Sequence, residues 1–237
     1  MKKGQISYFI IGGMVLILLA LLFTSINRIP QSITPSDLKL QASEYIDFCL
    51  EDSVNSAILW YGSEGRILHQ KFMEDEAGTI EYYYHAKTDH VPTLLEAEQE
   101  LEDAIAVGFE ECLVYQDELP FDIGTGKSDV DVIMTDEKTV VFVNFPVSII
   151  SNDRIDTFTE HSYSLDASIK PFLESSSAIV NAIIINDPWF DLSMLLDIEQ
   201  DITLIPYDEN TLIFQLKDPL HKIGGEDYEH YFAIDLS

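Results

Sequence analysis

The sequence predicts an α+β protein: an N-terminal transmembrane helix, then an exported domain with two N-terminal helices and a mainly antiparallel sheet with one further helix. Three observations support this prediction. An uncharged, largely apolar run separates Lys3 from Arg28. Two segments with helical spacing of apolar residues follow it. From Ser128 onward apolar and polar residues mostly alternate, and strands that follow a group of helices are typical of α+β proteins.

The apolar run comprises 24 consecutive uncharged residues. At about 1.5 Å per residue, a helix of this length crosses a hydrocarbon core of roughly 30 Å. A cleaved secretory signal normally has a shorter apolar region, so we expect an uncleaved anchor at 1–28, with 5–27 in the lipid bilayer; cleavage after Ser25 or Asn27 is the alternative. Two lysines precede the run, which predicts a cytoplasmic N-terminus and an extracellular C-terminal domain.

The next segment predicts a spacer and two helices. Residues 29–35 contain two prolines and are expected to form the spacer. The sequence TPSD at 34–37 is typical of a helix start, with a capping hydroxyl, a proline and an acid in the first turn. The sequence TLLE at 93–96 fits a capping box and starts the second helix. The helical part of the exported domain therefore spans 36–120.

A glycine-rich linker is expected at 121–128, followed by an α+β part at 129–237. The alternation of apolar and polar residues predicts two hairpins and a final strand, and Lys170-Pro171 predicts the start of the further helix. The expected strands are 130–134 with 140–147, 202–206 with 211–216, and 228–236.

The two cysteines, Cys49 and Cys112, both fall on the predicted inward faces of the two helices. In an exported domain such a pair favours a disulfide, which would stabilise the fold by about 4 kcal/mol through the closed loop. Two free thiols in a reducing compartment are the alternative.

The charge excludes one class of partner. The chain has 42 acidic and 13 basic residues, with a formal net charge of -29. Nucleic-acid binding depends on Lys and Arg at phosphates, so we do not expect it. The acidity fits a solvated surface in a salty or cation-rich medium. The nearest calcium-loop candidate, Asp129, Asp131 and Asp136, lacks the Gly and the Glu that an EF-hand requires.

We expect no catalytic residues, cofactor or metal site. The sequence GTGKS at 124–128 lacks the first glycine of a P-loop, because position 121 is Phe. The six histidines show no metal-binding spacing, and no G-x-S-x-G motif occurs. Paired acids such as Glu110-Glu111 leave a cell-envelope hydrolase as an alternative.

The best candidates for binding are Tyr82, Tyr83 and Tyr84. Exposed tyrosines suit contacts with glycans or with other envelope proteins. The competing interpretation, which we favour, is a strand whose aromatic residues pack in the core on one side.

The opening KKGQIS with its apolar run resembles the class III signal peptide of archaeal pilins, which implies processing between Gly4 and Gln5. Position 9 is Phe, where that family carries Glu. The remainder resembles uncharacterised archaeal single-pass surface proteins, through EYIDFCLEDSVNSAILWYGSEG, FEECL, NFPVSI and DITLIPYDENTLIFQL. This resemblance implies location and architecture only. We therefore expect a membrane-anchored, acidic cell-surface protein with a structural or interaction role and no enzymatic activity; a pilin-like subunit is an alternative.

Overall fold

The computed structural model describes residues 35–75, 78–114, 122–126, 128–151, 154–186 and 192–237. The chain divides into two units, Met1–Leu38 and Lys39–Ser237, and the fold below is that of the second unit. Among the described residues, no helix combines the length and apolar character needed to cross a membrane. The anchor predicted at 1–28 and most of the spacer lie outside the described residues.

Two long helices begin where the sequence predicts. Helix α2 (Pro35–Glu64) has proline at its first position and is followed by Gly65, whose φ of 78° is the left-handed conformation that ends many helices. Helix α3 (Leu94–Val114) starts with the predicted capping box. There the Thr93 amide donates to Glu96 Oε2 at 2.8 Å, and the Glu96 amide donates to Thr93 Oγ1 at 3.3 Å.

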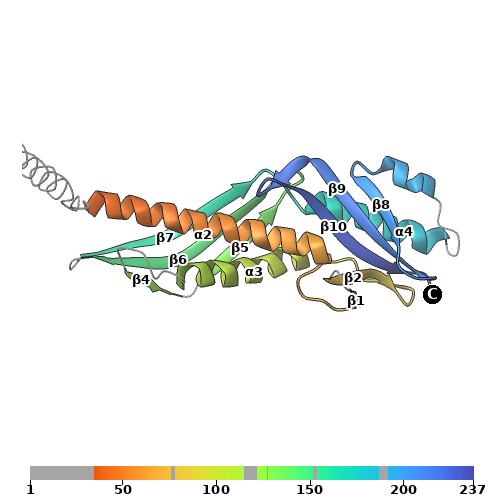
Figure 1. Ribbon diagram of the computed structural model, residues 1–237, viewed down its shortest axis with the longest axis horizontal. Coiled ribbons are helices and arrows are strands. Elements are labelled where there is room, and N and C mark those ends of the chain that lie inside the picture. Colours follow the sequence, from red (N-terminus) through yellow and green to blue (C-terminus); the bar gives the residue numbers. More distant parts are fainter. Residues whose placement is uncertain (1–34, 76–77, 115–121, 127, 152–153, 187–191) are drawn as a thin grey trace, which may run out of the picture. The chain divides into compact units, whose positions relative to one another are not determined.

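The larger sheet has the strand order β1-β2-β10-β9-β8 (Figure 1). Strand β3 pairs with β2. Strands β2 and β10 are parallel, whereas the other pairs are antiparallel. Its strands are β1 (Phe72–Asp75), β2 (Gly78–His85), β3 (Thr88–Asp89), β8 (Asp201–Pro206), β9 (Thr211–Ile223) and β10 (Glu226–Asp235).

The smaller sheet is built around one long strand. Strand β6 pairs along one side with β7 and along the other with β5 and then β4, always antiparallel. Helix α3 lies along the outer edge of β5. There Glu102 and Glu98 accept hydrogen bonds from the amides of Val132 and Met134, so the edge of the sheet is covered. The strands are β4 (Asp122–Thr125), β5 (Asp129–Met134), β6 (Thr139–Ser151) and β7 (Arg154–Leu165).

One hydrophobic core connects these layers. It contains buried residues of α2 and α3, of both sheets and of α4 (Lys170–Asn186). A 3-10 helix, η1 (Leu192–Asp197), follows α4. The α+β class, the two N-terminal helices and the further helix are thereby confirmed.

The predicted division of the domain needs correction. The segment expected to be helical, 36–120, also contains β1, β2 and β3, and the expected linker, 121–128, contains β4. Strand β2 lies between β1 and β10 in the larger sheet, and its adjacent residues Tyr83 and Tyr84 are both buried, so burial does not simply alternate along it. Because β2 pairs with β10, the segments on both sides of residues 121–128 share one sheet.

Candidate functional site

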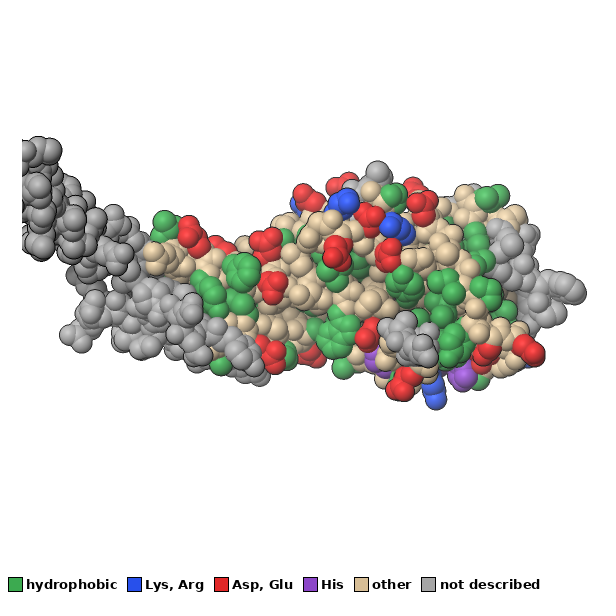
Figure 2. Space-filling view, viewed as in Figure 1, with side chains coloured by type: hydrophobic (Ala, Val, Ile, Leu, Met, Phe, Trp, Pro, Cys, Tyr) green, Lys and Arg blue, Asp and Glu red, His purple; other side chains and the backbone are tan. Residues whose placement is uncertain are grey.

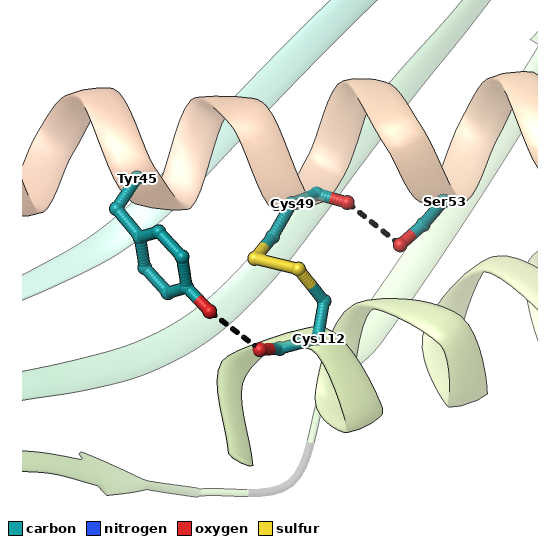
Figure 3. The surroundings of a disulfide bond; sticks show 4 residues. All are labelled: Tyr45, Cys49, Ser53 and Cys112. Atoms are coloured by element: carbon teal, nitrogen blue, oxygen red, sulfur yellow. Dashed lines mark hydrogen bonds between the residues drawn. A yellow bond between two sulfur atoms is a disulfide. The ribbon is translucent and has the colours of Figure 1, made fainter. Parts of the chain in front are cut away.

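A disulfide fixes α2 against α3 (Figure 3). Cys49 and Cys112 are bonded with their Cα atoms 5.6 Å apart, which confirms the predicted pair. The Tyr45 hydroxyl donates to the Cys112 carbonyl at 2.7 Å, and the Ser53 hydroxyl donates to the Cys49 carbonyl at 2.6 Å. The two helices are thus held by a covalent bond and a hydrogen bond between them.

The C-terminal end of α2 lies directly on the backbone of β10. A Cβ atom added to Gly62 would lie 2.4 Å from the Glu229 carbonyl oxygen, and one added to Gly65 would lie 2.4 Å from the Tyr231 carbonyl oxygen. Only glycine permits so close an approach. The exposed side of the last turns of α2 therefore borders the outer surface of the β9–β10 hairpin.

A polar network covers that outer surface. Lys217 Nζ lies 2.9 Å from Asp227 Oδ2 and 3.3 Å from Glu229 Oε1. The Tyr231 hydroxyl donates to Glu229 Oε2 at 2.6 Å, and Gln215 Nε2 donates to the same oxygen at 2.8 Å. The strand register explains the arrangement, since Lys217 pairs with Glu229 and Gln215 pairs with Tyr231 across the two strands.

The network fixes the charges of its members. Hydrogen bonds from Tyr231 and then Gln215 lower the pKa of Glu229, against the opposing effect of partial burial. Hydrogen bonds from Lys217 and Lys222 lower the pKa of Asp227. Burial, followed by the hydrogen bond to Glu229, raises the pKa of Tyr231 to about 12. Both carboxylates are therefore ionised at neutral pH, and the phenol is neutral.

Between α2 and this network lies a groove of about 760 Å³, called here the Trp60 groove. Trp60 is 47% exposed, although its neighbour Tyr61 is fully buried. An indole face beside fixed donors and acceptors suits a ligand with an apolar face and many hydroxyl groups. The lining residues are Leu59, Trp60, Ser63, Lys217, Lys222, Gly225, Glu226, Asp227, Glu229 and Tyr231.

Two buried carboxylates near the end of α2 have structural partners. Glu100 accepts hydrogen bonds from Arg66 Nε at 2.5 Å and from the amides of Ile67 and Leu68. Glu81 accepts hydrogen bonds from the amides of Gln70 and Lys71. These bonds hold the chain between α2 and β1, so part of the acidity of the protein serves its fold.

The core also contains a buried polar pair, Tyr83 and His230. The Tyr83 hydroxyl donates to the Gly65 carbonyl at 2.5 Å and lies 3.1 Å from His230 Nε2. Burial lowers the pKa of His230 to about 3, so this ring is neutral. The His230 side chain is fully buried against the rings of Tyr61, Tyr83 and Phe172, so its contacts are structural.

The structure separates the three predicted tyrosines. Tyr83 is fully buried and Tyr84 is 5% exposed, so neither side chain is accessible to a ligand. Tyr82 is partly buried on the opposite face of β2, beside Met73 and Ala233. The core-packing interpretation is confirmed for Tyr83 and Tyr84.

Other residues considered from the sequence lie apart from the Trp60 groove. Asp129 and Asp131 lie on β5, and Glu110 of α3 accepts a hydrogen bond from the Ser128 hydroxyl at 2.6 Å. Gly4 and Gln5 lie outside the described residues. No group of three or more His, Cys, Asp or Glu side chains suited to a metal ion occurs within the described ranges.

Sequence reasoning did not identify the residues of the Trp60 groove. The Gly224-Gly225 pair indicates a tight hairpin turn, and both glycines have positive φ. However, an irregularity next to the turn shifts the register, so that Asp227 pairs with Lys222 but Tyr228 pairs with Asp218. This shift decides which side chains share a face, and the sequence carries no clear signal for it.

Comparisons with protein-family models, curated proteins and solved structures gave no match to this chain.

Proposed function

We propose that this chain is a membrane-anchored cell-surface interaction protein and that the Trp60 groove binds a saccharide. The observation that carries the proposal is the half-exposed indole of Trp60 beside a network whose donors and acceptors are already held in place. The C–H face of a sugar ring stacks on an indole, and its hydroxyl groups exchange hydrogen bonds with charged side chains.

The charges of the groove favour binding over hydrolysis. A glycoside hydrolase needs one carboxylic acid that stays protonated near its working pH. In the Trp60 groove the pKa values of Asp227 and Glu229 are both lowered by their hydrogen-bond partners. These groups can accept hydrogen bonds from a ligand, but they are poor general acids at neutral pH.

The proposed location rests on the disulfide and on the sequence. Disulfides persist in oxidising compartments, which supports a domain outside the cell. The uncharged apolar run supports an anchor formed by residues 5–27. N-terminal sequencing of the membrane-bound protein separates the alternatives. A chain that starts at Met1 or Lys2 fits the anchor, whereas a start at Gln5 would favour a pilin-like subunit.

Isothermal titration of the full-length protein in detergent with maltotriose, mannotriose and chitotriose tests the binding site. We expect one of these sugars to bind, and the Trp60→Ala substitution to weaken binding at least about tenfold, which corresponds to about 1.4 kcal/mol. The matched control is Phe48→Ala, because Phe48 is a 58% exposed aromatic residue of the same helix outside the groove. Equal affinities of the two variants, or no binding by the unmodified protein, would contradict the proposal.

A further inference from the structure

A second groove lies between α2 and α3 on the side of the disulfide. Its volume is about 550 Å³, and apolar surface predominates over polar surface in its lining. Two aligned contacts, Cys49 with Cys112 and Ser53 with Gly108, show that the helices run antiparallel along it. The lining residues are Asp52, Ser53, Ser56, Ala57, Trp60, Ala104, Val107, Gly108, Glu111 and Cys112.

The walls of this α2–α3 groove expose apolar side chains. Val107 is 57% exposed and Trp60 is 47% exposed, so a partner could bury further apolar surface on both side chains. The floor consists of small residues such as Ala57 and Gly108, which lets another element approach closely. On the face shown in Figure 2, hydrophobic and acidic side chains lie over these helices.

The charged residues that line the groove are both acidic. Asp52 and Glu111 line it, and the sequence has no Lys, Arg or His at 40–64 or 94–114. Five acidic residues lie in the first of these segments and seven in the second. A second copy of this chain, with its own net charge of -29, would be repelled. The complementary occupant is basic.

The α2–α3 groove favours a helical partner segment over an extended one. Both of its walls are helices, whose amide and carbonyl groups are already bonded within each helix. An extended peptide would therefore find no backbone partners along most of the groove. A helix satisfies its own backbone groups and packs through side chains alone.

We propose that the α2–α3 groove binds an amphipathic helix of a partner protein, with an apolar stripe against Trp60 and Val107 and with Lys or Arg on its flanks. This site is independent of the Trp60 groove, apart from Trp60 itself, which lines both. Substitutions that test it must therefore be made at residues that line only the α2–α3 groove.

The test uses a labelled 18-residue helical peptide with Leu and Ala on one face and Lys on the other, titrated with the full-length protein by fluorescence anisotropy. The variant is Val107→Lys, and the matched control is Leu95→Lys. Leu95 is 63% exposed on the same helix and does not line the groove, so both substitutions change the net charge equally at exposed sites. Circular dichroism verifies that both variants are folded.

We expect Val107→Lys to weaken peptide binding at least tenfold relative to Leu95→Lys. Raising the salt concentration from 0.1 M to 1 M shortens the Debye length from about 10 Å to about 3 Å and should also weaken binding. A peptide with Glu in place of Lys should not bind. Equal affinities of the two variants would show that the attraction is only non-specific and would overturn the proposal, as would no binding by the unmodified protein.

Discussion

Replacing Gly62 by alanine tests the close approach of α2 to β10. In the interior of an exposed helix, Gly→Ala normally stabilises by up to about 1 kcal/mol. At Gly62 the new methyl group would lie 2.4 Å from the Glu229 carbonyl oxygen and 2.6 Å from the Tyr228 ring, where ordinary contacts begin at 3.4 Å. The Glu229 backbone is held in the sheet by its pairing with Lys217, so the helix itself must move by about 1 Å.

Overpacking of this kind typically costs about 1–3 kcal/mol, which exceeds the gain in helix propensity. We therefore expect Gly62→Ala to lower the free energy of unfolding by about 2 kcal/mol. The matched control is Gly108→Ala in α3, whose methyl group would lie 3.4 Å from the Ser53 side chain, at the limit of an ordinary contact. That substitution should be neutral or stabilising by up to about 1 kcal/mol.

Urea denaturation of the full-length protein in detergent, followed by circular dichroism, gives both values. We expect a lower midpoint for Gly62→Ala than for Gly108→Ala. If Gly62→Ala were as stable as Gly108→Ala, α2 would not rest on the backbone of β10. The geometry of the Trp60 groove would then need revision.

Two further predictions concern the disulfide and pH. Because the loop between Cys49 and Cys112 spans 63 positions, reduction should lower the free energy of unfolding by about 4 kcal/mol, and identical urea midpoints for the oxidised and reduced protein would refute this. His230 has a folded pKa of about 3 against an ordinary value of 6.5, so the unfolded state binds more protons between these values. Stability should therefore fall as the pH drops through that window, by up to about 1.4 kcal/mol per pH unit. The His230→Gln variant should lose this part of the slope, and an unchanged slope would show that His230 does not cause it.

The helices and the disulfide could be predicted because their signals are local. Pro35 and the Thr93–Glu96 capping box mark helix starts in the sequence, and both are used in the structure. The periodicity that placed Cys49 and Cys112 on inward faces was sufficient to pair them. The hairpins at 129–147 and 201–216 followed from alternation in the same way.

The site could not be predicted because it depends on relationships between distant segments. Trp60 is exposed while Tyr61 is buried, and this difference arises from the place where α2 lies on the backbone of β10. Glu81 is fully buried in β2 because its carboxylate accepts amide hydrogen bonds from the chain at 70–71, which sequence polarity does not suggest. The parallel pairing of β2 with β10 also joins segments that local patterns treated as separate.

The saccharide proposal is tested most directly at the indole N–H group of Trp60. The chain contains two tryptophans, so a nuclear magnetic resonance spectrum of the disulfide-bonded protein shows two indole signals, and a Trp60→Phe variant assigns them. We expect a trisaccharide to shift the Trp60 signal saturably. An unmoved Trp60 signal at saturating sugar would contradict the proposal.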